Sequence, residues 1–492
     1  MAYKLQDGEF LNSSIMDYDA LKPHEECGVF GIYANGEVNP AYAAYNGLLA
    51  LQHRGQESCG IAVCNDGVIS YSKDMGLVTE AFNDKILDSL EGQMAVGHVR
   101  YSTSGGSVRE NAQPLVMRYI KGTLAIAHNG NLTNAYELHQ ILEHRGCIFQ
   151  TTIDTEVLAY MIARERVDSS SIEEAVRRTI PKIQGSFSLV IMSPQKLIAA
   201  RDPHGFRPLC IGKIGNSTVF ASETCALDAC GAEFVRDVEP GEVVMVDKDG
   251  LHSFRDPVTV EKSLCIFEYI YFARTDSIID GISVYEARKQ AGRFLAKQMP
   301  VEADIVIGVP ESGIDAAIGY SEESGIPYEK GIVKNTYIGR TFIKPSQSDR
   351  ERSVRIKLNA LPSCVKGKRI VMLDDSIVRG TTSARIVTML KDAGAKEVHL
   401  RISSPPFLWP CYYGTDIPSK NDLIACQHSI QEIGEMSYAD SIDFLSVENL
   451  VKIMGGRKGY CDACFSGKYP APVPDYLIAS KNYDYNTPIK RF

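Results

Sequence analysis

The chain has 492 residues, about three times the length of a typical domain, so we expect two or more packed units rather than one small module. Its composition, with 44% hydrophobic and 23% charged residues, is that of a globular protein and argues against extensive disorder. A formal net charge of −9 disfavours a general nucleic-acid or acidic-membrane surface, and no apolar run reaches the roughly 18 residues of a spanning helix.

The first 26 residues lack the apolar stretch of a secretory signal, because Asp7, Glu9, Asp17 and Asp19 interrupt them. We therefore expect a soluble, cytoplasmic protein. Its 13 cysteines are then better interpreted as free thiols or metal ligands than as disulfides.

From Cys27 to about Arg255 the pattern predicts a strand-rich α+β unit, with short apolar runs between Gly, Asn and Asp turns. Two helices are expected there, one over Asn134–Arg145 and one for which Asp154 is the N-cap. The predicted strands are Gly28–Tyr33, Gly60–Cys64, Met94–Tyr101, Thr123–His128, Phe187–Met192, Leu197–Arg201 and Val243–Val246.

From about Val301 strands and helices alternate, which predicts βαβ units and a parallel sheet with its ligand at the carboxyl ends of the strands. From about Gln427 the chain is expected to be helical and then irregular. The alternating elements are the strands Asp304–Val309, Arg369–Leu373 and Val398–Ile402 and the helices Ser312–Ser324 and Thr381–Ala393.

The segment from Arg369 to Thr382 is the clearest phosphate-binding signal. A hydrophobic strand ends in Asp374 and Asp375, and a Gly/Thr loop then begins a helix, so backbone N–H groups and the helix dipole can face a phosphate. The two carboxylates suit ribose hydroxyls and Mg²⁺. An ordinary strand–turn–helix is the alternative for Gly-Thr-Thr alone, but the whole string resembles the phosphoribosyl pyrophosphate (PRPP) signature of type I phosphoribosyltransferases.

That resemblance implies that Ser376, Arg379, Gly380, Thr381 and Thr382 bind the 5-phosphate and that Asp374 and Asp375 face the ribose. It also implies that the loop with Glu311 and Ser312 binds pyrophosphate, with Ser312 joining Asp374 and Asp375 around Mg²⁺.

The segment 330–357 carries a local net charge of +6 within an acidic protein. A solvated loop is the simpler interpretation. A mobile cationic lid over an anionic, water-sensitive substrate explains the sign of the charge better, with Lys334, Arg340 and Lys344 as contacts.

Cys27 stands directly before a predicted strand. If the chain is cleaved after Glu26, the new α-amine, with an ordinary pKa near 8, becomes a general base for the Cys27 thiol. A Cys-Gly pair is by itself more often structural. The strings Leu51–Glu57, Gly97–Thr103 and His128–Asn131, however, resemble glutamine amidotransferases of the N-terminal nucleophile class.

In that class Arg100 would pair with the substrate carboxylate and Asp154 with the substrate ammonium group. The Asn129 side-chain amide and the Gly130 N–H would form an oxyanion hole, although an Asn-Gly pair alone is typical of a hairpin turn.

Cys461 and Cys464 form a C-x₂-C pair, and Cys265 and Cys411 lie elsewhere. Spacing alone does not distinguish zinc, a redox dithiol and an iron–sulfur cluster. The contexts of these four cysteines resemble the ligand sites of the iron–sulfur branch of the amidophosphoribosyltransferase family, which implies a 4Fe-4S cluster of structural role. A zinc Cys₄ site remains the alternative.

The resemblance to this family covers the chain from Cys27 to about Pro470. It implies an αββα N-terminal-nucleophile glutaminase domain followed by an α/β type I phosphoribosyltransferase domain. The expected divisions are a self-cleaved propeptide over 1–26, a glutaminase domain over 27–255, a phosphoribosyltransferase domain over 256–430 and a helical or irregular tail over 431–492.

The implied reaction converts PRPP, glutamine and water to 5-phosphoribosylamine, glutamate and pyrophosphate, the first committed step of purine synthesis. The family also implies a homotetramer and feedback inhibition by purine nucleotides, with neither nucleic acid nor a membrane as partner.

Two other interpretations share only half of these motifs. A glucosamine-phosphate synthase would share the glutaminase strings but would lack Asp374–Thr382. A non-enzymatic PRPP-responsive regulator would share the second half, but the intact set of Cys27, Arg100, Asn129 and Asp154 argues against it.

Overall fold

The computed structural model describes residues 27–36, 38–101, 106–257, 259–335, 358–415, 417, 419–456, 458–475 and 477. These residues form two compact units, neither of them continuous in sequence. The sandwich unit contains residues 27–291, 407–423 and those from 446 onwards. The parallel-sheet unit contains residues 292–406 and 424–445. These packing units differ from the linear divisions expected at residues 255 and 430, because the chain returns twice to the sandwich unit.

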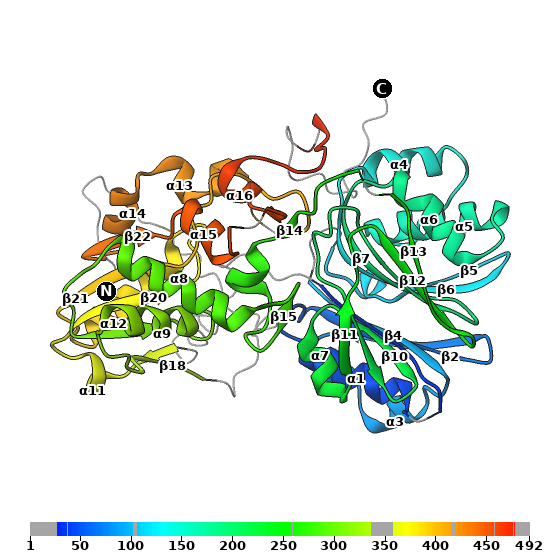
Figure 1. The fold of residues 1–492 in the computed structure, drawn as a ribbon, viewed down its shortest axis with the longest axis horizontal. Helices are drawn as coiled ribbons and strands as arrows, with labels where there is room; N and C mark the ends of the chain where they lie inside the picture. Colours follow the sequence, from blue (N-terminus) through cyan, green and yellow to red (C-terminus); the bar gives the residue numbers. More distant parts are fainter. Residues whose placement is uncertain are drawn as a thin grey trace. The chain divides into compact units, whose positions relative to one another are not determined.

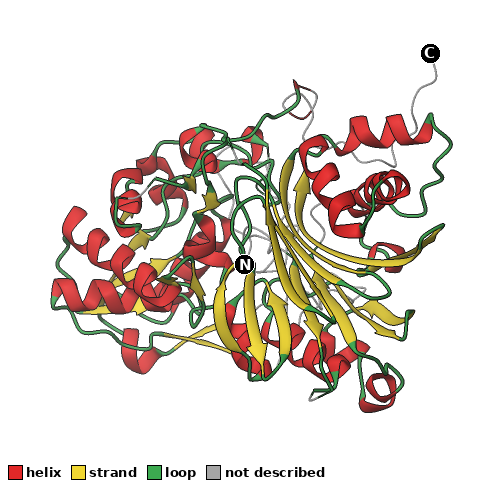
Figure 2. Cartoon of the chain, turned by 45° about the vertical axis from the view of Figure 1, so that its right-hand side comes forward, coloured by secondary structure: helices red, strands yellow, loops and turns green. Residues whose placement is uncertain are grey.

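The sandwich unit contains two antiparallel sheets (Figures 1 and 2). The first, in spatial order, consists of β11 (Glu233–Asp237), β9 (Cys210–Ile214), β10 (Ser217–Ala221), β1 (Gly28–Tyr33), β4 (Met94–Arg100), β2 (Ser58–Asn65) and β3 (Val68–Met75). The second consists of β13 (Gly250–Arg255), β12 (Glu242–Asp247), β8 (Leu197–Arg201), β7 (Gly185–Met192), β6 (Gly122–Leu132) and β5 (Leu115–Tyr119).

Side-chain alternation along β1 shows why the sheets stack. Val29 points into the core between the two sheets, while Phe30 and Ile32 belong to the core under the helices of the first sheet. A strand covered on both faces must be apolar at nearly every position, and β1 is. The helices over the first sheet are α1 (Pro40–Ala50), α2 (Val78–Ala81), α3 (Asp84–Asp88) and α7 (Thr224–Cys230).

The helices over the second sheet are α4 (Ala135–Glu143), α5 (Asp154–Asp168) and α6 (Ile172–Thr179), and they enclose a third core (Figure 1). The layers are therefore helix, sheet, sheet and helix, which confirms the expected αββα sandwich. The remaining elements of this unit include a π-helix at Glu268–Phe272 and the paired strands β14 (Leu264–Cys265) and β23 (Tyr460–Cys461), followed by α16 (Ala463–Ser466).

The parallel-sheet unit is built on strands β17 (Ile305–Gly308), β20 (Arg369–Asp374), β21 (Glu397–Ile402) and β22 (Ser441–Phe444), all parallel and in that order. The main helices on this sheet are α9 (Gly313–Ser324), α12 (Thr381–Asp392) and α14 (Ile430–Met436). A two-stranded ribbon of β18 (Ile332–Lys334) and β19 (Leu358–Ala360) belongs to the same unit. The expected α/β parallel-sheet fold is confirmed.

Two expectations about local structure were wrong. The region expected to be helical and irregular contains β22, a four-residue and mostly half-buried strand with too little apolar character to be recognised from sequence. Asp154 is the first residue of α5 and not its N-cap, which is Ile153. Among the described residues, none of the helices combines the length and the apolar composition that a membrane span needs.

Candidate active sites

Cys27 lies immediately before β1 and is 7% exposed. Its thiol donates a long hydrogen bond to the Tyr101 carbonyl, with a sulfur–oxygen distance of 3.5 Å. Burial raises the pKa of the Cys27 thiol to about 11, so at neutral pH it is protonated and needs a base before it can act as a nucleophile.

Asn129 and Gly130 lie within strand β6 and not in a hairpin turn. Asn129 is fully buried, and neither its amide nitrogen nor its amide oxygen has a hydrogen-bond partner among the described residues. Gly130 has a φ of 148°, and a Cβ there would lie 2.2 Å from the Ser186 carbonyl oxygen. A buried amide without partners is costly in a folded protein, so this arrangement suits a group kept for a ligand.

Asp154 is held in its ionised form by its neighbours. Its Oδ2 accepts the Leu132 N–H at 2.9 Å, and its Oδ1 lies 3.3 Å from His128 Nδ1. Burial alone would raise the pKa of Asp154, but the nearby His128 and these hydrogen bonds lower it below its ordinary value. The carboxylate is therefore charged at neutral pH, as the capture of an ammonium group requires.

Arg100 is the last residue of β4 and is 2% exposed, and its guanidinium forms hydrogen bonds with other residues of the protein. Its guanidinium donates to Glu57 Oε1 at 2.7 Å and to the Gly106 carbonyl at 3.4 Å. Glu57 and His128 were not assigned roles from sequence. Glu57 lies in the string Leu51–Glu57 and His128 in the string His128–Asn131, and their place in these amidotransferase-like strings was the only sign in the sequence that they belong to the site.

The phosphate-type loops of the parallel-sheet unit lie at the carboxyl ends of the adjacent strands β17 and β20. The Val309 N–H donates to the Leu373 carbonyl at 2.9 Å, and a Cβ on Gly313 would lie 2.4 Å from the same oxygen. The Ser312 hydroxyl donates to the Asp375 carboxylate, which also accepts from Ser376 Oγ at 2.5 Å. The two loops therefore form one site.

The residues that begin α12 have the expected phosphate-binding character. Gly380, the N-cap, has a φ of 79°, and buried Thr382 has an Oγ1 without a hydrogen-bond partner within the described chain. Asp374 and Asp375 are buried, and Arg379, Thr381 and Glu311 are exposed. Lys334, partly exposed, ends β18, while Arg340 and Lys344 lie outside the described residues.

The four cysteines expected to bind a metal group all belong to the sandwich unit. Cys265 is in register with Cys461 between β14 and β23, and the Cys464 carbonyl accepts the N–H groups of Leu408 and Trp409 at 3.1 Å. Burial raises the pKa of Cys464 far above its ordinary value, and the nearby Cys265, Cys411 and Cys461 raise it further.

Four neighbouring cysteines are a donor set suited to a thiolate-ligated metal group. Across the described ranges, however, no three or more His, Cys, Asp or Glu side chains are placed so that they could hold a metal ion. Asp374, Asp375 and Ser312 still fit Mg²⁺ in chemical type, because Mg²⁺ is commonly held by one or two carboxylates with substrate phosphates and water.

Comparison with known proteins identifies the family. A family model described as a glutamine amidotransferase domain matches residues 98–229. Amidophosphoribosyltransferase of Archaeoglobus fulgidus is 51% identical, over 91% of this chain and 98% of its own length. The Bacillus subtilis protein of the same name is 50% identical, over 92% of this chain and 95% of its own length.

A solved structure of the B. subtilis glutamine PRPP amidotransferase, complexed with ADP and GMP, is also similar. It superposes with a TM-score of 0.85 at 50% identity and covers 91% of this chain and 98% of that one. The identity and the coverage are high enough to fix the family. This chain belongs to the amidophosphoribosyltransferase family.

Proposed function

We propose that this chain forms 5-phosphoribosylamine from PRPP with glutamine as the nitrogen donor, the first committed step of purine synthesis, and that it does so in the cytoplasm. The observation that carries the proposal is the pair of complementary sites. A buried cysteine, an ionised aspartate and a buried amide that has no hydrogen-bond partner among the described residues lie in one unit, and two joined phosphate-type loops lie in the other.

In the first half-reaction Cys27 Sγ attacks the side-chain amide carbon of glutamine. Removal of residues 1–26 would free the α-amine of Cys27, which takes the thiol proton and passes it to the departing ammonia. The Asn129 side-chain N–H and the Gly130 N–H hold the negative oxygen of the tetrahedral intermediate. Arg100 and Asp154 bind the substrate carboxylate and ammonium groups. Water then hydrolyses the thioester to glutamate and restores the thiol.

In the second half-reaction the ammonia displaces pyrophosphate from C1 of the sugar. Residues Ser376–Thr382 hold the 5-phosphate at the beginning of α12, where backbone N–H groups and the helix dipole favour an anion. Asp374 and Asp375 accept hydrogen bonds from the ribose hydroxyls. The loop with Glu311 and Ser312 holds the pyrophosphate, and Lys334, Arg340 and Lys344 belong to a lid that excludes water. Ser312, Asp374 and Asp375 would hold Mg²⁺, which would supply positive charge to offset that of the leaving pyrophosphate.

The four cysteines Cys265, Cys411, Cys461 and Cys464 are proposed to bind a 4Fe-4S cluster that stabilises the sandwich unit, with zinc as the alternative metal. A homotetramer and feedback inhibition by purine nucleotides complete the proposal. The similar B. subtilis structure, a complex with ADP and GMP, supports nucleotide binding.

The test is Cys27→Ala in the full-length protein. We expect loss of glutamine-dependent synthesis and retention of ammonia-dependent synthesis, both followed as 5-phosphoribosylamine formed from PRPP. Cys59→Ala is the matched control, because Cys59 is a buried thiol on β2 with no proposed role. Loss of both activities in a folded Cys27→Ala protein would contradict the division of labour between the units.

A further inference from the structure

Behind Cys27 the sandwich unit contains a cluster of buried charges that the proposed mechanism does not use. Arg54 and Glu223 are each 1% exposed, and Glu268 is fully buried. Arg54 NH1 lies 2.5 Å from Glu223 Oε1, and Arg54 NH2 lies 2.7 Å from Glu268 Oε1. A second buried guanidinium, that of Arg207, lies 3.8 Å from Glu268 Oε1 through its NH1. Burying an ion costs several kcal/mol unless it is well paired, so a cluster of buried charges calls for an explanation.

Arg54 connects this cluster to the proposed nucleophile. Its Nε donates a hydrogen bond to the main-chain carbonyl of Cys27 at 3.3 Å, while both terminal nitrogens are engaged by the carboxylates. Because the guanidinium is planar and its donors point in fixed directions, pairing its terminal nitrogens with the carboxylates fixes the direction of the Nε–H bond to the Cys27 carbonyl. Lysine carries the same charge but has no such fork of donors.

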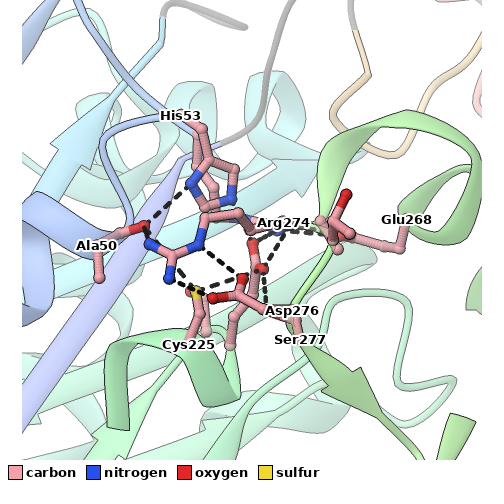
Figure 3. Close-up of polar contacts among 12 residues, drawn as sticks. Ala50, His53, Cys225, Glu268, Arg274, Asp276 and Ser277 are labelled. Carbon is pink, nitrogen blue, oxygen red and sulfur yellow. Dashed lines mark hydrogen bonds and ion pairs between the residues drawn. The ribbon is translucent and has the colours of Figure 1, made fainter. Parts of the chain in front are cut away.

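Glu223 accepts hydrogen bonds from several other groups besides Arg54. His53 Nε2 lies 2.8 Å from Glu223 Oε1. Its Oε2 accepts the Arg274 N–H at 2.9 Å and the Ser277 hydroxyl at 2.6 Å. Figure 3 shows the labelled side chains of His53, Cys225 and Ser277 gathered in this cluster, with Glu268 to one side.

The position of Glu223 is itself set by the nucleophile strand. The preceding residue, Ser222, donates its N–H to the Val29 carbonyl at 3.0 Å and accepts the Val29 N–H on its hydroxyl at 2.9 Å. Burial raises the pKa of Glu223, but the nearby His53 and Arg54 lower it more, so the net pKa is well below the ordinary value. Glu223 is therefore a fixed negative charge at a fixed distance from the start of β1.

We propose that Glu223 is a positioning residue for glutamine hydrolysis: it holds the Arg54 guanidinium against the carbonyl of Cys27, and so sets where the nucleophile stands. The inference rests on the proposed role of Cys27 as that nucleophile. Glu223 touches no substrate in this scheme and acts only through Arg54. Arg100 and Asp154, which are proposed to bind glutamine, are not part of the cluster.

The test is a double-mutant cycle on glutamine hydrolysis in the full-length protein. We expect Glu223→Gln to lower kcat about tenfold to a hundredfold, since small displacements of a reacting group cost that much, with KM for glutamine within about twofold of wild type. Arg54→Lys should have a similar effect. Because both changes act on one contact, kcat of the double variant should be no lower than kcat of Arg54→Lys alone.

Glu242→Gln is the matched control. Glu242 is also a buried carboxylate of this unit, 2% exposed and paired with Arg236 at 2.7 Å, but it lies on β12 and makes no contact in the cluster. This control should lose stability and keep its kcat. If Glu223→Gln does not fold, Glu223→Asp enters the same cycle, because it keeps the charge but withdraws the carboxylate from Arg54.

Two results would overturn the inference. One is a double variant in which the fold-decreases in kcat of the two single variants multiply, and the other is a wild-type kcat in folded Glu223→Gln. Its failure is distinguishable from failure of the proposed function. A wild-type protein that does not hydrolyse glutamine contradicts the function, whereas an active wild type with an unaffected Glu223→Gln variant contradicts only the positioning role. Ammonia-dependent synthesis should be unchanged in every variant of the cycle.

Discussion

The hydroxyl of Ser312 donates a hydrogen bond to the carboxylate of Asp375. Ser312 is the N-cap of α9, and Asp375 directly follows β20, so one contact joins the loops that follow two neighbouring parallel strands. The sequence places these residues 63 positions apart. Their contact makes the proposed pyrophosphate loop and the proposed ribose carboxylates parts of one site.

Ser312→Ala should therefore weaken PRPP binding whichever nitrogen source is supplied. Loss of a hydrogen bond to a charged group costs about 1.5–3 kcal/mol, so we expect KM for PRPP to rise roughly tenfold or more. Glutamine hydrolysis without PRPP should not change. Ser321→Ala is the control, because it removes a hydroxyl from the same helix that donates to the Ile326 carbonyl. An unchanged KM for PRPP would contradict the role of Ser312.

Asn129→Ala separates activity from stability. Because the buried amide has no partner in the described part of the chain, its removal should cost little stability while kcat for glutamine hydrolysis falls about 10²–10³-fold, as for other oxyanion donors. Asn111→Ala should lose stability and keep its kcat, since the Asn111 amide donates hydrogen bonds to the Gly106 carbonyl and the Thr152 hydroxyl. Melting temperatures and kcat are the measurements. A larger stability loss in Asn129→Ala than in Asn111→Ala would refute the proposed use of the amide.

Gly130→Ala should abolish glutamine hydrolysis, because a Cβ at 2.2 Å from the Ser186 carbonyl forces β6 and β7 apart. Gly146→Ala is the comparison. Gly146 also has a positive φ, 85°, but a Cβ there meets no atom within 4 Å, so only backbone strain is added. We expect folded, active Gly146→Ala. Normal hydrolysis by Gly130→Ala would show that this strand position is not part of the site.

The lowered pKa of Asp154 predicts a pH dependence of stability. Its interactions stabilise the folded protein fully above the ordinary aspartate pKa of 3.8, and this contribution is lost as pH falls through the lower folded-state pKa. The urea midpoint of Asp154→Asn should lie below that of wild type by a constant amount from pH 7 to about pH 5. The difference should shrink as pH falls below 3.8. A constant difference at all pH values would contradict the ionised Asp154.

The proposed metal group can be followed through Trp409, the only tryptophan of the chain. The main-chain N–H of Trp409 donates to the Cys464 carbonyl at 3.1 Å, and Lys420 Nζ lies 3.1 Å from the centre of the Trp409 ring. Anaerobically purified wild type should contain about four iron atoms per chain, as expected for Cys₄ ligation of this cluster. Cys464→Ser should lose the iron and change the Trp409 emission.

Cys426→Ser is the control for this experiment, because Cys426 is an exposed thiol. It should keep both the iron content and the emission of wild type. Zinc in place of iron, found by elemental analysis, would establish the alternative metal. Absence of both metals from protein purified without oxygen or chelators would contradict any metal role for the four cysteines.

Much of the fold was predictable, because strands buried on both faces and helices that cover them leave regular apolar patterns. The boundaries of β1 and β8 agree with the expectation to the residue, and α12 to within one. The short strand β22 could not be predicted, since three half-buried residues and one buried residue carry little periodic signal. The order of the strands within each sheet also had no counterpart in the sequence.

The residue types of both sites could be recognised from sequence, because a nucleophilic thiol, paired carboxylates and Gly-rich turns form local strings with recognisable chemistry. Which of these groups face each other became known only from the folded chain. It placed Glu57 against Arg100, His128 against Asp154 and Glu223 against Arg54, and left the Asn129 amide without a partner in the described residues. Contacts between residues far apart in the chain depend on strand order and burial, and local sequence encodes neither.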